Sequence, residues 1–210
     1  MPLLTRLFHA AAPLQGVITC NCSAGSNPLP TFILQMSKIT FNQYPQFFTA
    51  TILEWKYLLA NDIFKHIIIS SLQFLVKDSR VVLYGFVLMP NHIHLIWQMQ
   101  DTHERARVQQ SFLKYTAQQI KCEMKKTNVL ELESYKVKAS DRQYQFWERN
   151  PLSVDLWSRH VFLQKLNYIH HNPTRPPWNL CKYPEEYKYS SARFYEKGID
   201  EFGLISHYLG

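Results

Sequence analysis

The stretch VLMPNHIHLIW, residues 87–97, places His92 and His94 in an otherwise apolar run. Because side chains alternate between the two faces of a strand, both imidazoles would point one way, while Ile93 and Leu95 would point the other. Two such residues lie about 7 Å apart along a strand. They can bind one metal ion if a further ligand comes from elsewhere. The alternative is a pair of core histidines bonded to backbone or hydroxyl groups.

The segments around this stretch predict an α+β protein with an antiparallel sheet. Residues 47–55, FFTATILEW, are rich in the aromatic and β-branched residues that favour strands. Residues 80–90 and 92–99 predict two more strands, and the short link between them makes these strands antiparallel neighbours. Apolar residues at helical spacing predict a helix over 61–78. The histidine pair would then lie near the start of a central, buried strand.

Residues 105–126 predict a long basic helix, since the segment lacks Gly and Pro and its apolar residues recur at helical spacing. The segment has six basic residues and one acidic residue, so much of the chain's formal charge of +7 would lie on it. Tyr115 and Gln119 fall one turn apart, at the border between the apolar and basic faces. The residues of the basic face that are candidates for binding phosphates are Arg107, Lys114, Lys121 and Lys125.

The remaining sequence predicts smaller elements. Residues 127–142 are polar and predict a loop, and short strands are expected within 144–150 and 152–157. Residues 159–171 predict a helix that ends before Pro173. Three histidines in this helix are expected to act as capping or phosphate-contacting groups rather than as metal ligands: His160, His170 and His171.

Length and composition fit one folded domain with an N-terminal extension. We expect the domain to span residues 36–210, which is enough for a core of its own. Residues 1–35 predict a disordered or unrelated extension. A weak secretory signal is the alternative, although His9, Pro13 and Gln15 interrupt its apolar stretch. No window reaches the roughly 18 apolar residues of a membrane span, and the four cysteines fit a reduced, cytoplasmic protein.

Several motifs together resemble one family. PNHIHLIW (90–97), KYTAQQIK (114–121), YIHHNP (168–173) and YPEEYKYSSAR (183–193) are similar to the REP-associated tyrosine transposases, a branch of the single-tyrosine, His-hydrophobic-His transposases. The resemblance runs from about residue 36 to the C-terminus. It implies a ferredoxin-like or RRM-like α+β fold, with the histidine pair on the central antiparallel sheet and the nucleophilic tyrosine on a helix packed beside it.

The resemblance also implies a site and a reaction. His92 and His94 take the metal-ligand positions, Tyr115 the nucleophile position, and Gln119 the ligand position one helical turn after the tyrosine. Imidazole ligands alone would suggest zinc or manganese, whereas the resemblance implies Mg²⁺ or Mn²⁺. The implied substrate is single-stranded DNA with a hairpin, such as a REP-like palindrome. Its cleavage and rejoining would pass through a 5′-phosphotyrosine, in a monomer or a homodimer.

Two other functions stay open. A metal-dependent hydrolase that uses water would recruit more ligands, whereas three apolar residues follow His94. A non-catalytic, domesticated hairpin-binding module would keep the basic face and would not need Tyr115. In a transposase or in a hairpin-binding module, Trp147 or Tyr187 could stack on unpaired bases. A place in the core is the alternative for each.

Overall fold

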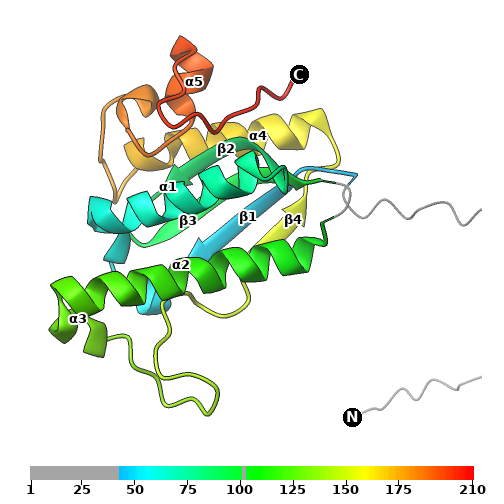
Figure 1. Cartoon of the computed structure of the whole chain (residues 1–210). Helices are drawn as coiled ribbons and strands as arrows, with labels where there is room; N and C mark the ends of the chain where they lie inside the picture. The colour runs from blue at the N-terminus through cyan, green and yellow to red at the C-terminus, as the bar shows by residue number, and fades with distance from the viewer. Residues whose placement is uncertain (1–42, 101–102) are drawn as a thin grey trace, which may run out of the picture. The chain divides into compact units, whose positions relative to one another are not determined.

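The computed structural model of the protein describes residues 43–100 and 103–210, which form an α+β fold around a four-stranded antiparallel sheet (Figure 1). The strands, in the sheet order β2-β3-β1-β4, are β1 (Gln46–Thr51), β2 (Val81–Leu88), β3 (His92–Met99) and β4 (Leu152–Asp155). The helices are α1 (Asp62–Lys77), α2 (Arg105–Thr127), α3 (Val129–Glu133), α4 (Arg159–His171) and α5 (Ala192–Lys197). The predicted α+β fold is confirmed.

Helices cover both faces of the sheet, so strand β3 is apolar along most of its length (Figure 1). On one face, Leu95 and Trp97 belong to the core that the sheet shares with α1 and α2. On the other face, Ile96 packs in a second core with residues of α4. Because side chains alternate along a strand, His92 and His94 lie on the same face as Ile96. The histidine pair therefore faces α4, and α1 and α2 lie on the opposite face.

Side-chain caps fix the start of the helices on each face. The Asn61 side chain accepts a hydrogen bond from the backbone N–H of Ile63 (3.0 Å) at the start of α1. The Ser158 hydroxyl accepts one from the N–H of Val161 (3.2 Å) at the start of α4. Such caps satisfy backbone donors that the first helical turn leaves unpaired.

Helix α4 lies close against β2 because Gly85 has no side chain. A Cβ atom at this position would lie 2.7 Å from Cδ1 of Leu166 and 3.1 Å from Cδ1 of Ile169. The β2–β3 register also shifts between Leu83 and Gly85, which marks a bulge at this point. Gly85 thus sets how near α4 approaches the sheet.

The structure differs from the sequence predictions in three segments. Strand β1 ends at Thr51, because Leu53–Trp55 form a 3₁₀ turn instead of continuing the predicted strand. The predicted loop at 127–142 contains the short helix α3, which the Asn128 side chain caps. Residues 144–150 form only isolated bridges rather than a strand.

The predicted extension at residues 1–35, and the predicted domain boundary at residue 36, lie outside the described residues and stay predictions. Within the described part of the chain, every helix is too short or too polar to cross a membrane.

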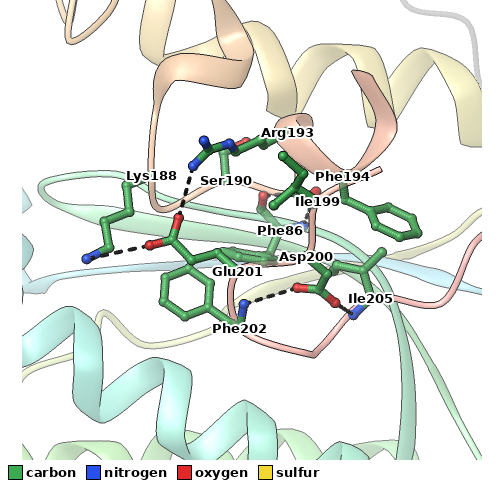
Figure 2. A pocket seen from close by; sticks show the side chains of 11 residues that line it. Phe86, Lys188, Ser190, Arg193, Phe194, Ile199, Asp200, Glu201, Phe202 and Ile205 are labelled. Carbon is green, nitrogen blue, oxygen red and sulfur yellow. Dashed lines mark hydrogen bonds and ion pairs between the residues drawn. The ribbon is translucent and has the colours of Figure 1, made fainter. Parts of the chain in front are cut away.

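Two carboxylates hold the C-terminal segment together (Figure 2). Asp200 accepts a hydrogen bond from the backbone N–H of Ile205 (2.7 Å). Glu201 lies between Lys188 and Arg193, at 3.8 and 3.5 Å. The cavity beside them is about 10 Å³, which is room for one water molecule at most. The cluster therefore stabilises the fold, and the cavity beside it is too small to hold a substrate.

Candidate functional site

His92 and His94 lie side by side on the α4 face of the sheet. Their ring centroids are 4.7 Å apart, and the rings are inclined at 70°. Both residues are buried, at 7% and 6% exposure. A buried polar nitrogen is unfavourable unless it has a partner, so the partners of the four ring nitrogens decide what the pair can do.

The neighbours of both histidines leave Nε2 available as a ligand. The Asn91 amide nitrogen donates to the carbonyl of Trp55 (3.2 Å), which turns the Asn91 amide oxygen toward Nδ1 of His92 (2.6 Å). Because that oxygen can only accept, Nδ1 of His92 carries the proton and Nε2 carries the lone pair. Nδ1 of His94 lies 2.7 Å from the Thr49 hydroxyl, and its buried Nε2 has no partner among the described residues. Metal-binding histidines are commonly held in this way, through the second nitrogen.

Burial keeps both imidazoles neutral. Desolvation lowers the pKa of His92 to about 4. Desolvation, followed by the nearby charges of His92 and Lys165, lowers the pKa of His94 to about 3. Both imidazoles are therefore in the neutral form at neutral pH, which is the state that binds a metal ion.

Tyr168 of α4 lies against this pair. Its ring centroid is 5.4 Å from that of His94, and the residue is 38% exposed, so solvent reaches part of it. Lys165, almost one turn earlier on α4, places its amine 5.7 Å from the Tyr168 ring and 4.9 Å from the Phe47 ring. Within residues 43–100 and 103–210, Lys165 forms no ion pair. A hydroxyl-bearing ring and an unpaired cation thus adjoin the histidines.

Tyr115 and Gln119, the predicted nucleophile and ligand, lie elsewhere. Tyr115 is 52% exposed and lines a groove of about 350 Å³ between α1 and α2, together with Phe74. Both helices pack on the face of the sheet opposite to the histidines. The structure therefore does not bring Tyr115 or Gln119 together with His92 and His94.

The four predicted DNA-binding residues also lie on α2. Arg107 forms an ion pair with Glu104 (2.7 Å). Lys114 and Lys125 are exposed, and Lys121 is half-buried. Their role in binding DNA stays a prediction, and the structure places them on a different face from the histidine pair.

Trp147 is buried in the core, which was one of the two alternatives for it, and Tyr187 is half-buried and packs against the core. The indole N–H of Trp147 donates to the hydroxyl of Thr116 (3.1 Å). The hydroxyl of Tyr187 donates to the carbonyl of Leu88 (2.8 Å). The buried Trp147 ring is therefore not free to stack on a base.

Asn172 follows Tyr168 by one helical turn, the same spacing that links Gln119 to Tyr115. Asn172 is buried, and its amide nitrogen has no partner among the described residues. By contrast, Nε2 of His170 pairs with the Ser191 hydroxyl (2.9 Å) and is occupied. The motif YIHHNP already contained this signal, since its tyrosine is followed four residues later by an amide-bearing residue. The sequence predictions did not include this pair.

The described residues contain no group of three or more His, Cys, Asp or Glu side chains that could hold a metal ion. Any further ligand that the described residues supply to an ion on the histidine pair would therefore be an uncharged group such as an amide, with water or substrate oxygens beside it. Asn172, the residue that follows the last residue of α4, carries such an amide, and the buried, unpartnered Nε2 of His94 fits a metal ligand.

Comparison with known proteins identifies the fold. No family model and no curated sequence matches the chain. A solved structure described as a REP-associated tyrosine transposase bound to a REP hairpin superposes with a TM-score of 0.56 at 15% identity, over 79% of this chain and 87% of that one. A candidate transposase from Deinococcus radiodurans R1 aligns with a TM-score of 0.42 at 12% identity, over 60% of this chain and 88% of that one. The first of these similarities confirms the predicted likeness to the REP-associated transposases at the level of the fold.

Proposed function

We propose that this protein is a metal-dependent enzyme that cleaves and rejoins single-stranded DNA beside a hairpin, with Tyr168 as the nucleophile. The observation that carries the proposal is the 5.4 Å distance between the rings of Tyr168 and His94, beside an Nε2 atom that is buried without a partner among the described residues. The fold shared with a transposase bound to a REP hairpin supports a hairpin substrate. Tyr168 takes the role that the resemblance had implied for Tyr115.

The proposed reaction is an exchange of phosphodiester bonds. The Tyr168 hydroxyl attacks phosphorus, and a bond from its oxygen to phosphorus forms as the bond from phosphorus to the 3′-oxygen breaks. The departing strand leaves with a 3′-OH that takes up the tyrosine's proton, and the other strand stays on Tyr168 as a 5′-phosphotyrosine. Attack by a 3′-OH reverses the step, so no further reactant is consumed. The Lys165 amine, close to the Tyr168 ring, would offset the charge of the phosphate.

His92 and His94 would hold the metal ion through Nε2, and the Asn172 amide oxygen would complete the protein's share of the ligands. When bound, the ion would polarise the scissile phosphate and stabilise the charge that develops on it. Mn²⁺ accepts imidazole together with oxygen ligands, and Mg²⁺ prefers oxygen. Mn²⁺ therefore fits this mixed set better, and Mg²⁺ is the second candidate.

The test is the formation of a covalent adduct. Purified protein is mixed with end-labelled single-stranded DNA that carries a hairpin, in Mn²⁺ or Mg²⁺, and analysed by denaturing electrophoresis. We expect an adduct with the unaltered protein and none with Tyr168→Phe, because the ring remains and only the attacking oxygen is lost. Tyr115→Phe is the matched control, since it removes a hydroxyl from the opposite face of the sheet and should leave the adduct unchanged.

Three results would contradict the proposal. An adduct that persists in Tyr168→Phe and disappears in Tyr115→Phe would return the nucleophile to α2. An adduct that EDTA does not suppress, or that survives replacement of both His92 and His94 by Ala, would exclude the metal site. Binding of hairpin DNA without any adduct would favour the non-catalytic module.

A further inference from the structure

A row of aromatic rings leads away from the histidine pair on the side opposite to Tyr168. The Trp178 ring lies 5.8 Å from that of His92, inclined at 55°. The Tyr57 ring lies 5.6 Å from Trp178, inclined at 56°. His92 and His94 thus have Tyr168 at one end of the row and Trp178 with Tyr57 at the other.

The outer ring of this row is open to solvent. Tyr57 is 63% exposed, and Trp178 is half-buried. The position of Tyr57 in the row therefore owes little to the core, whereas Trp178 also packs against the core on the α4 face. An exposed ring beside a second aromatic ring offers a flat apolar surface, and nothing in the described residues covers it.

The turn that leads to Tyr57 is anchored to the histidine site. Glu54 and Trp55 both have left-handed backbone conformations, with φ of 56° and 57°, which non-glycine residues rarely adopt. The carbonyl of Trp55 accepts the hydrogen bond from Asn91, whose amide oxygen faces His92. The backbone of Leu59 also donates to the carbonyl of Pro90 (2.8 Å). These bonds hold the segment around Tyr57 at a fixed place next to the proposed metal ligand.

We propose that Tyr57 and Trp178 form a stacking subsite for one unpaired nucleobase of the DNA strand, next to the scissile phosphate; the inference rests on the proposed function and extends it to how the strand is positioned. Aromatic rings bind unpaired bases through their faces, without needing a particular base. An unpaired base is available only in single-stranded DNA, so the subsite would favour single strands over duplex. The base stacked there would fix which phosphodiester bond lies over His92 and His94.

Charge complements this arrangement. The amine of Lys165 lies at the Tyr168 end of the row and forms no ion pair within the described ranges. A strand that crosses the row would therefore meet a cation for its phosphates at one end and aromatic faces for a base at the other. This combination of a cation with exposed rings is typical of surfaces that bind single-stranded nucleic acid.

The experiment is an abasic scan. Hairpin oligonucleotides that each lack one base in the unpaired flank, with the backbone intact, are titrated with the Tyr168→Phe protein, which binds without reacting. We expect one abasic position to weaken binding roughly 5- to 100-fold, the range for the loss of one stacked base. When the titrated protein also carries Tyr57→Ala or Trp178→Ala, the same abasic oligonucleotide should bind no more weakly than the intact one. Tyr57→Phe and Trp178→Phe should restore the difference.

Phe74→Ala is the matched control, because Phe74 is also exposed, at 56%, and lies on α1 on the opposite face. An abasic profile that is flat in the protein without ring substitutions, or that is unaltered by Tyr57→Ala and Trp178→Ala, would overturn the stacking subsite. Because the adduct assay is independent of this scan, a flat profile together with a normal adduct would leave the proposed function standing. Absence of both hairpin binding and adduct would instead remove the proposed function.

Discussion

At the scale of single residues, the oxygen atoms that contact the Nδ1 atoms matter as much as the imidazoles themselves. Asn91 and Thr49 each face the Nδ1 atom of one histidine, at 2.6 and 2.7 Å. These contacts orient both rings, and the Asn91 oxygen also holds the proton of His92 on Nδ1, so that its Nε2 is ready to bind a metal ion.

Replacing Thr49 by Val should weaken metal binding while leaving the fold intact. The valine side chain has nearly the same shape but cannot pair with Nδ1 of His94, so the ring loses its preferred orientation. We expect Mn²⁺ affinity to fall about tenfold or more, the usual effect of losing such an outer partner. Calorimetric titration with Mn²⁺ measures it, and Thr49→Ser, which keeps the hydroxyl, should retain most of the affinity. Equal affinities for the Val and Ser variants would show that this contact does not tune the site.

The sequence predicted the paired histidines and their common face, because strand alternation alone places them. It did not distinguish Tyr115 from Tyr168. Both tyrosines lie on helices, and each has an amide-bearing residue four positions later. Periodicity tells which side of a helix is apolar, whereas the choice of sheet face depends on how the connections run in three dimensions. The proposal of Tyr168 rests on the packing of α4 against Ile96, which places this helix on the histidine face of the sheet.

At the scale of elements, α4 is the part of the fold whose position matters most for the proposed chemistry. It carries Lys165, Tyr168 and, at its end, Asn172. Its distance from the sheet is set where Leu166 and Ile169 meet Gly85 of β2. The sequence predicted this helix at its observed bounds, with Pro173 as the signal for its end, but no sequence pattern pointed to the close contact at Gly85.

Gly85→Ala should therefore shift α4 and impair the reaction. The added methyl group would meet Leu166 and Ile169 in a packed core, which typically destabilises a protein by about 1–3 kcal/mol. We expect a lower urea midpoint and slower adduct formation, with hairpin affinity less affected. Gly198→Ala, at a glycine with a positive φ of 68° but open space around it, is the control for backbone strain alone. Its stability should fall while adduct formation per folded molecule stays constant. Unchanged adduct formation in Gly85→Ala would mean that α4 accommodates the methyl group.

At the scale of the whole molecule, three buried histidines couple folding to pH. Burial lowers the pKa of His92 and His170 to about 4 and that of His94 to about 3. An unfolded chain takes up protons near the ordinary value of about 6.5. Between these values the unfolded state binds more protons than the folded state, so the free energy of unfolding must decrease as the pH falls.

His170→Asn isolates the contribution of the one histidine among these three that is not itself a proposed metal ligand. At pH 7 the variant should be less stable than the unaltered protein, because it loses the contact with Ser191. As the pH falls from 6.5 to 4, the free energy of unfolding of the unaltered protein should decrease by roughly 2–3 kcal/mol more than that of the variant. This difference follows from the size of the shift in the pKa of His170. Urea unfolding at pH 7, 6, 5 and 4 measures the gap between the two proteins. A gap that stays constant with pH would mean that His170 is protonated equally in both states.

The contact between Tyr168 and His94 also has a consequence for stoichiometry. The two rings come from β3 and α4, which are far apart in the sequence, yet both belong to the same polypeptide. A nucleophile and its proposed metal ligands supplied by one copy make the reaction at a single DNA end first order in protein. Pairing of two DNA ends would then bring together two complete catalytic units. It would not assemble each unit from parts of two copies.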